Sequence, residues 1–253
     1  MHKLVSVNIG KKKVQLRFDD EIININPETY TEFKLYPNKE VSDKEYKDIL
    51  KKDKIQGDYV YALNLISSRM YTVKQIEDKL IKRGTSIKAR EEIIKKLTSS
   101  NLLNDKDYLE TYLTYLNEKL YGELRIKEEL RNKGISIEDI AKLNFDEKKE
   151  INKASELLLK LDTKYEKYPY LKKKQKVYEA LYRYGYPYEL IDIVIVKLPQ
   201  GDKTNETKSL KLEYKKAYEK YSKKLDGYEL KDAVTKYLIR KGYRYNDIKN
   251  INE

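Results

Sequence analysis

One eight-residue phrase occurs four times in this chain, each time around a glycine. The copies occupy residues 80–87, 130–137, 181–188 and 238–245, and their glycines are Gly84, Gly134, Gly185 and Gly242. A phrase that returns after about fifty residues indicates tandem structural repeats, in which each unit packs on its neighbours. The repeat therefore limits the fold more than any other feature of the sequence.

Each copy of the phrase has the pattern of a helix that ends at its glycine. A leucine stands four residues earlier and a β-branched aliphatic residue eight earlier, a spacing that places both on one helical stripe. Glycine suits the left-handed conformation that commonly follows a last helical turn. Ser86 and Ser136 then stand where a next helix needs an N-cap, Pro187 suits a first turn, and an apolar or aromatic residue follows in every copy: Ile87, Ile137, Tyr188 and Tyr245. The phrase predicts a helix, a glycine stop, a tight turn and another helix.

The N-terminal segment has a different pattern. Val5, Val7 and Ile9 alternate with polar residues before a glycine-containing turn, and alternation resumes over residues 14–18. Period two on both sides of a turn predicts a β-hairpin. A short helix should follow Asn26-Pro27, and the capping box that begins at Ser42 should open a second short helix with Tyr46, Ile49 and Leu50 inward.

From these patterns we predict a mainly α fold, an elongated and curved array of tandem three-helix repeats behind a small N-terminal α/β cap. The cap takes residues 1–54 and contains the β-hairpin and the short helices. The repeats take residues 55–103, 104–145, 146–200 and 201–253, since each holds one glycine phrase between two further apolar periodicities.

The composition favours a soluble partner-binding protein. The net charge is +12, which favours a polyanionic partner, although lysine is abundant throughout and a thinly spread excess is often a solvated surface. The chain has no cysteine, which excludes disulfides and thiolate metal sites, and no apolar run of membrane-spanning length. We expect a cytoplasmic location and no membrane partner.

Catalytic chemistry has little support. The single histidine, His2, stands at the terminus, and no glycine-lysine-serine phosphate loop occurs. Asp19, Asp20 and Glu21 could hold a divalent cation, but we prefer a hairpin turn there, and Asp105 and Asp107 suit a helix start. We therefore predict no enzyme, no catalytic residue, no metal and no cofactor.

Basic residues are the main functional candidates. Seven cations lie in the last turn before a repeat glycine: Lys82, Arg83, Arg131, Lys133, Arg183, Arg240 and Lys241. Cations there complement the helix dipole, yet stacked repeats would also place them along one edge as a stripe for phosphates. Residues 172–174 are all lysine and follow Tyr165, Tyr168 and Tyr170, as in single-strand binders, although core packing and a solvated face explain them too.

Three segments carry a family resemblance. The residues Ala62, Leu65, Arg69, Thr72, Ile76, Leu80 and Gly84 resemble the first helical repeat of the RecX regulatory-protein family, and Asn104-Asp105 with Tyr108 is similar to the opening of its second. The most specific stretch resembles the signature G-x-x-R-I-x-x-E-L-x-x-K-G-I through Gly122, Arg125, Ile126, Glu129, Leu130, Lys133, Gly134 and Ile135. The resemblance covers about residues 55–145, and the later repeats match more loosely. Asn104 replaces an acidic residue, and Tyr188 and Tyr245 replace aliphatic residues.

The resemblance implies a non-enzymatic regulator that binds filaments of RecA on single-stranded DNA along their groove. Such a protein inhibits the ATPase, strand exchange and filament growth. Its expected partners are RecA and single-stranded DNA, with double-stranded DNA as a further possibility, and we expect a monomer. We name as hypothetical RecA- or DNA-binding residues Arg69, Lys82, Arg83, Arg125, Lys127, Arg131, Lys133, Lys172, Lys173, Lys174, Arg183, Arg240, Lys241 and Arg244.

Two alternatives stay open. The first is a general nucleic-acid-binding helical repeat protein without a recombinase partner, which would bind bare DNA as tightly as RecA-coated DNA. The second is a metal-dependent nuclease at residues 19–21, which would cleave DNA with magnesium and which we do not expect.

Overall fold

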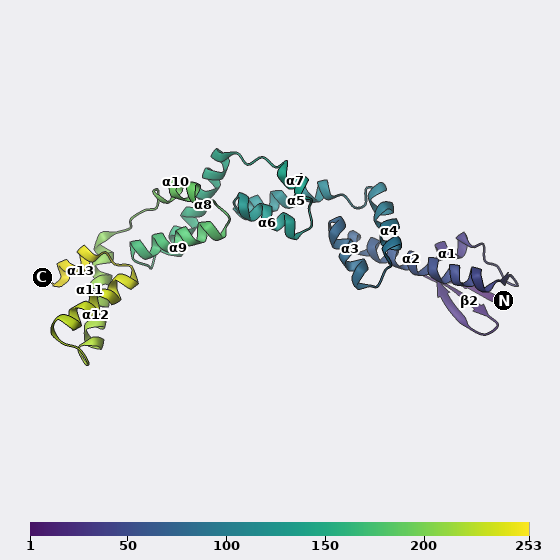
Figure 1. The fold of residues 1–253 in the computed structure, drawn as a ribbon, viewed down its shortest axis with the longest axis horizontal. Coiled ribbons are helices and arrows are strands. Elements are labelled where there is room, and N and C mark those ends of the chain that lie inside the picture. The colour runs from purple at the N-terminus through teal and green to yellow at the C-terminus, as the bar shows by residue number, and fades with distance from the viewer. Residues whose placement is uncertain (253) are drawn as a thin grey trace. The chain divides into compact units, whose positions relative to one another are not determined.

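The computed structural model describes residues 1–252 and is mainly helical, with a small sheet at the N-terminus (Figure 1). The chain forms two compact units. One comprises residues 1–111 and 132–136, and the other comprises residues 112–131 and 137–253. Within the described residues, no helix combines the length and the hydrophobicity that a membrane crossing requires.

The sheet contains the predicted hairpin and two further strands. Strands β1 (His2–Ile9), β2 (Val14–Phe18), β3 (Ile22–Ile25) and β4 (Glu40–Val41) are antiparallel in the order β3-β2-β1-β4. The register of β1 on β2 shifts between Leu4 and Ser6. Leu4 is fully buried, and Val7 packs against the same core although the two are three positions apart, because the irregularity between them shifts the alternation by one residue.

Helix α1 (Pro27–Glu32) follows the sheet, and helix α2 (Asp43–Ser68) then runs without interruption from the sheet into the first repeat. The predicted short helix with a boundary near residue 54 was wrong, as was the inward position of Leu50, which is exposed. Asp53 of α2 accepts hydrogen bonds from the backbone and side-chain nitrogens of Asn26, at 2.5 and 2.7 Å. Because Asn26 is buried, this contact fixes the sheet on the first half of α2.

The rest of the first unit packs α3 (Val73–Lys82) and α4 (Ile87–Ser99) on the second half of α2, and includes the start of α5 (Asp105–Glu118). A capping box of Thr72 and Gln75 opens α3. The core that α2, α3 and α4 share contains Ala62, Ile76, Leu80, Ile93 and Leu97. Ile76 and Leu80 are the β-branched and leucine positions that the repeat phrase predicts, and the other three residues pack in the same core.

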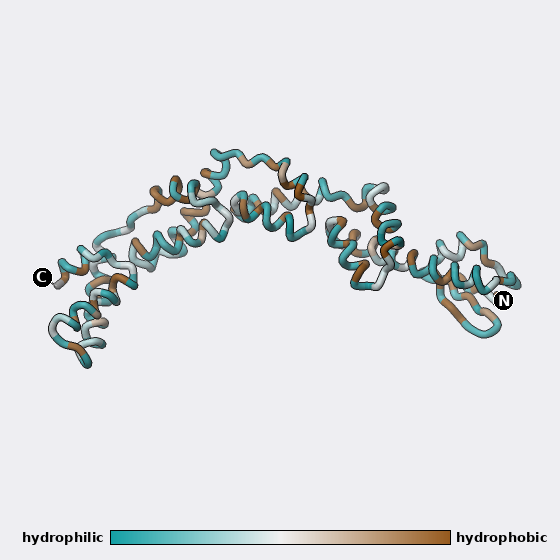
Figure 2. Tube along the Cα trace, viewed as in Figure 1, coloured by the Kyte–Doolittle hydropathy of each residue, from teal (hydrophilic) through white to brown (hydrophobic). Residues whose placement is uncertain are grey.

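The second unit consists mainly of the later helices of the chain. Eight helices of the described residues follow α5: α6 (Glu123–Asn132), α7 (Ile137–Ala141), α8 (Glu147–Lys164), α9 (Tyr170–Arg183), α10 (Tyr188–Ile195), α11 (Lys203–Tyr221), α12 (Gly227–Lys241) and α13 (Tyr245–Asn252), of which α6 ends in the first unit. Hydrophobic residues alternate with hydrophilic ones along these helices (Figure 2). Separate cores form around Val177 and Leu181 and around Val234 and Leu238.

The predicted succession of helix, glycine and helix is confirmed in all four copies. Each repeat glycine has a positive φ, between 77° and 98°. Each follows one of the four helices α3, α6, α9 and α12, which we call the middle helices.

Candidate functional site

We call the seven residues centred on each repeat glycine a corner: residues 81–87, 131–137, 182–188 and 239–245. The first corner shows the local geometry. The amide of Gly84 donates to the carbonyl of Ile81 at 2.9 Å, and that of Thr85 donates to the carbonyl of Leu80 at 3.1 Å. These two bonds are a Schellman motif, which satisfies the last carbonyls of the helix and needs a left-handed residue at its glycine. The third and fourth corners repeat both bonds.

The residue immediately after each glycine turns into the core. Thr85, Ile135, Tyr186 and Tyr243 are all buried. Tyr186 is fully buried, and its hydroxyl donates to the carbonyl of Leu120 at 2.9 Å. The sequence analysis missed this position because its side chains differ in kind, although they share a place one residue after the glycine.

Three of the four corners pack against the first turn of the preceding middle helix. A Cβ on Gly134 would overlap Lys74 of α3, a Cβ on Gly185 would overlap Arg125 of α6, and a Cβ on Gly242 would overlap Lys172 of α9. The glycine is therefore required for a close approach as well as for its φ. Gly84 differs, because nothing lies within 4 Å of its Cβ position.

Hydrogen bonds accompany this packing. At the third corner, the amides of Gly122 and Leu124 donate to the carbonyls of Tyr184 and Gly185 at 2.8 and 3.0 Å. At the second, the Thr72 hydroxyl donates to the carbonyl of Lys133 at 2.6 Å. The free amides of one helix start thus meet carbonyls at the end of the next middle helix, a favourable alignment of helix dipoles.

Every corner exposes one cation that forms no ion pair with a described residue, and one apolar or aromatic residue. The cations are Lys82, Arg131, Arg183 and Arg240, and the structure gives them no ion pair within the described residues. The residues three places after the glycines are exposed by 53% to 72% of their surface: Ile87, Ile137, Tyr188 and Tyr245. Each corner thus keeps one of the predicted basic residues exposed and without an ion pair among the described residues.

Two cations next to a glycine have structural partners instead. The Arg83 guanidinium lies 2.6 Å from a carboxylate oxygen of Asp58, a buried residue that also accepts the Thr85 hydroxyl at 2.7 Å. Lys241 pairs with Glu213 at 3.4 Å. Burial is the largest single influence on Glu213 and opposes its ionisation, but the hydrogen bonds and charges of Lys241 and Lys216 together outweigh it and lower the Glu213 pKa. The hydrogen bonds to Tyr237 and Glu213 raise the Lys241 pKa.

Other predicted site residues are also engaged within the fold. Arg125 pairs with Glu129 at 2.7 Å, and Lys127 pairs with Glu123. Other contacts are cation–π: the Arg69 guanidinium lies 4.6 Å from the Tyr71 ring centre, and that of Arg244 lies 5.3 Å from the Tyr170 ring centre.

The three lysines at 172–174 differ in their surroundings, and this corrects the prediction that all three contact a partner. Lys173 is buried, and its ammonium binds Asp162 at 2.6 Å and the carbonyl of Pro199 at 2.9 Å. Lys172 lies against Gly242, and Lys174 is half-buried.

A stack of tyrosine rings marks the third corner. The rings of Tyr182 and Tyr188 are 4.8 Å apart and inclined by 7°, and Tyr178 stacks on Tyr188 at 6.2 Å. Tyr182 and Tyr188 are each about half exposed. Beside them, Leu124, Arg125, Glu128 and Arg183 line an open hollow of about 350 Å³. The third corner thus joins an aromatic surface to a solvated guanidinium.

One acidic residue acts outside its own helix. Asp105 was predicted as the start of α5, and its carboxylate also accepts the backbone amide of Val73 at 2.8 Å, at the start of α3. Because the two residues are 32 positions apart, sequence spacing alone could not reveal the contact.

Comparison with known proteins places these features in a family. Residues 59–97 match the first three-helix domain of RecX, and residues 148–195 match its third three-helix domain. The chain is 34% identical over 239 residues to the regulatory protein RecX of Lactococcus lactis subsp. lactis (strain IL1403), covering 91% of this chain and 88% of that protein. It is 30% identical over 259 residues to regulatory protein RecX of Streptococcus gordonii, covering 98% of each.

Solved structures agree. A crystal structure of regulatory protein RecX, 25% identical, covers 77% of this chain and 98% of its own with a TM-score of 0.63. The crystal structure of RecX from Lactobacillus salivarius, 34% identical, covers 58% of this chain and 97% of its own with a TM-score of 0.51.

Proposed function

Because this chain belongs to the RecX family of regulatory proteins, we propose that it binds RecA–single-stranded DNA filaments along their groove and restrains them. In this proposal it inhibits ATP hydrolysis, strand exchange and filament growth, acts as a monomer and catalyses no reaction. The observation that carries the proposal is family membership over nine-tenths of the chain or more.

The corners support a role in contacting the filament. Each offers a cation that forms no ion pair within the part of the chain that the structure describes, and such residues neutralise phosphates without reading sequence. The aliphatic residues Ile87 and Ile137 suit a protein surface, whereas Tyr182 and Tyr188 present ring faces on which bases stack. We assign the cations of all four corners to phosphates, Ile87 and Ile137 to RecA, and the rings of Tyr182 and Tyr188 to DNA bases.

The main test follows ATP hydrolysis by RecA on single-stranded DNA while this protein is titrated in. We expect hydrolysis to fall at stoichiometric protein. Unchanged hydrolysis would refute the proposed regulation of RecA.

A quadruple variant tests the corner cations: K82A/R131A/R183A/R240A. It should keep its circular dichroism spectrum but inhibit RecA weakly. The slope of the logarithm of its affinity for single-stranded DNA against the logarithm of salt concentration should fall in magnitude by about 3, at about 0.7 per phosphate contact. A control with the same change of charge replaces four exposed lysines away from the corners: K12A/K54A/K95A/K148A. Equal loss in both variants would show that only net charge matters.

The assignment of corners is tested by two double variants. Tyr182→Ala with Tyr188→Ala should weaken binding to bare single-stranded DNA by about 1–3 kcal/mol for each base that stacks there. Ile87→Ala with Ile137→Ala should leave that binding unchanged and weaken binding to the filament. The reverse pattern would overturn the assignment.

The alternative function is general nucleic-acid binding without a recombinase partner, which the net charge of +12 favours. The two are distinguished by comparing affinity for bare and RecA-coated single-stranded DNA at the same salt concentration. Equal affinities would favour the alternative.

A further inference from the structure

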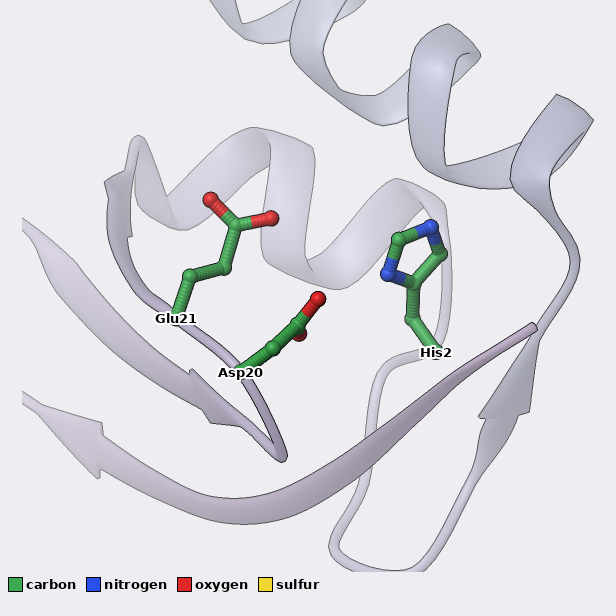
Figure 3. A group of neighbouring side chains, drawn as sticks. All are labelled: His2, Asp20 and Glu21. Atoms are coloured by element: carbon green, nitrogen blue, oxygen red, sulfur yellow. The ribbon is translucent and has the colours of Figure 1, made fainter.

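Three potential metal ligands meet at the open end of the N-terminal sheet (Figure 3). His2 begins β1, and Asp20 and Glu21 form the turn between β2 and β3. One ligand atom from each residue lies within 4.8 Å of the others. The register that pairs Leu4 with Phe18 brings them together, since it places the start of β1 beside that turn.

The His2 ring is held in an orientation that suits a ligand. Its Nε2 lies 3.3 Å from a carboxylate oxygen of Asp43, which in turn binds the N-terminal amine at 2.8 Å. Figure 3 shows the other ring nitrogen turned toward Asp20 and Glu21. Carboxylates commonly lie beside one nitrogen of a metal-binding histidine and orient its ring so that the other nitrogen can bind the metal.

Tyr46 holds both the histidine and one carboxylate. Its ring stacks on His2 at 4.2 Å, and its hydroxyl donates to Glu21 at 2.6 Å. Tyr46 is itself buried and packs edge-on against Phe18 at 5.2 Å. The buried Tyr46 thus positions one carboxylate oxygen of Glu21 through its hydroxyl, and the other carboxylate oxygen can bind a ligand.

We propose that His2, Asp20 and Glu21 form a binding site for one divalent transition-metal ion, with Zn²⁺ as the best fit. One imidazole nitrogen and two carboxylate oxygens suit Zn²⁺ or Mn²⁺, whereas Mg²⁺ and Ca²⁺ prefer oxygen alone. Bonds of 2.0–2.1 Å in a tetrahedral site place ligand atoms roughly 3.3 Å apart, so the exposed carboxylates close by about 1.5 Å. Water completes the coordination.

A metal ion there has a structural consequence. It fastens the start of the first strand to a turn eighteen positions along the chain. It also neutralises carboxylates that lie together in a chain of positive net charge. This inference does not depend on the proposed regulation of RecA.

The test uses a chain that carries no affinity tag, because added histidines would bind the metal. His2 is the only histidine, so its two ring nitrogens give the only imidazole signals in a ¹⁵N spectrum. Titration with Zn²⁺ should move the Nδ1 signal to the metal-bound range and saturate at one ion per chain. Calorimetry should give the same stoichiometry, and excess Mg²⁺ should not displace the ion.

Variants separate this site from other ways of binding. His2→Asn and the double variant Asp20→Asn with Glu21→Gln should each abolish saturable binding, Asp43→Asn should weaken it about tenfold or more, and Asp19→Asn, the matched control in the same turn, should not. The proposal is overturned if Zn²⁺ leaves the imidazole signals unchanged. It is equally overturned if the carboxylate variant binds normally, because the N-terminal amine and His2 then suffice.

Discussion

Replacing Gly185 by alanine should destabilise the second unit far more than the same change at Gly84 destabilises the first. Both glycines have a positive φ, 90° at Gly185 and 77° at Gly84, so both changes share a left-handed penalty of about 1 kcal/mol. They differ in surroundings. The Gly185 methyl would overlap the backbone of Arg125, whereas the Gly84 methyl would meet nothing within 4 Å.

The magnitude follows from the contacts at the third corner. Forcing a methyl into a packed junction costs about 1–3 kcal/mol. The two hydrogen bonds from Gly122 and Leu124 to the corner carbonyls would lengthen, at about 1 kcal/mol each. We therefore expect Gly185→Ala to cost roughly 4–6 kcal/mol and Gly84→Ala about 1 kcal/mol.

Amide hydrogen exchange is the assay of choice, because two units need not unfold in one transition. Exchange at the Leu124 amide should accelerate by about a thousandfold or more in Gly185→Ala, and should be unchanged in Gly84→Ala. The reasoning fails if the two substitutions destabilise equally, or if the Leu124 amide keeps its protection when Gly185 is replaced.

Three further predictions concern residues inside the fold. Arg83→Ala should lower stability by about 1–3 kcal/mol, measured by urea unfolding, because it leaves the buried Asp58 with fewer partners. Lys173→Ala should lower the free energy of unfolding because Asp162 loses its ion-pair partner, yet it should leave the salt dependence of DNA binding unchanged. A weaker salt dependence would show that Lys173 contacts DNA. Burial raises the Tyr186 pKa above its ordinary 10.0, so its stabilising effect is complete below pH 10 and is lost as the pH rises further. Tyr186→Phe should reduce the fall of the melting temperature above pH 10. A melting temperature with the same pH dependence as that of the unchanged protein would contradict this prediction.

The sequence predicts the repeats well because their signal is local. A leucine four places before a glycine needs only one helix and its stop, and the cores around Leu80, Leu181 and Leu238 confirm it. The hairpin was predicted from its alternation for the same reason. The division into repeats at residues 55–103, 104–145, 146–200 and 201–253 and the curvature of the array stay predictions.

Features that join distant residues were missed. Strand β4 has two residues, too few to show a period, and forms only because β1 offers an edge. The length of α2 was misjudged because its two halves pack different cores, so its apolar stripe changes direction near residue 54.

Among the site residues, the sequence supplied the cations but could not tell which are solvated. Arg83 and Lys82 are neighbours, yet only the first faces a buried carboxylate, which comes from another helix. Lys173 was similarly grouped with exposed neighbours although its helical position points inward. Exposure depends on partners, and partners depend on the fold.

The way each middle helix begins has a consequence for how the protein is made. The Thr72 hydroxyl bonds to the Lys133 carbonyl, which lies 61 residues further along the chain. A ribosome synthesises those residues over roughly three to twelve seconds. During that interval the start of α3 lacks its partner, and the start of α6 then waits in the same way for Tyr184 and Gly185. The nascent chain therefore carries one or two incomplete helix starts as it grows, and each emerging corner completes the repeat made before it.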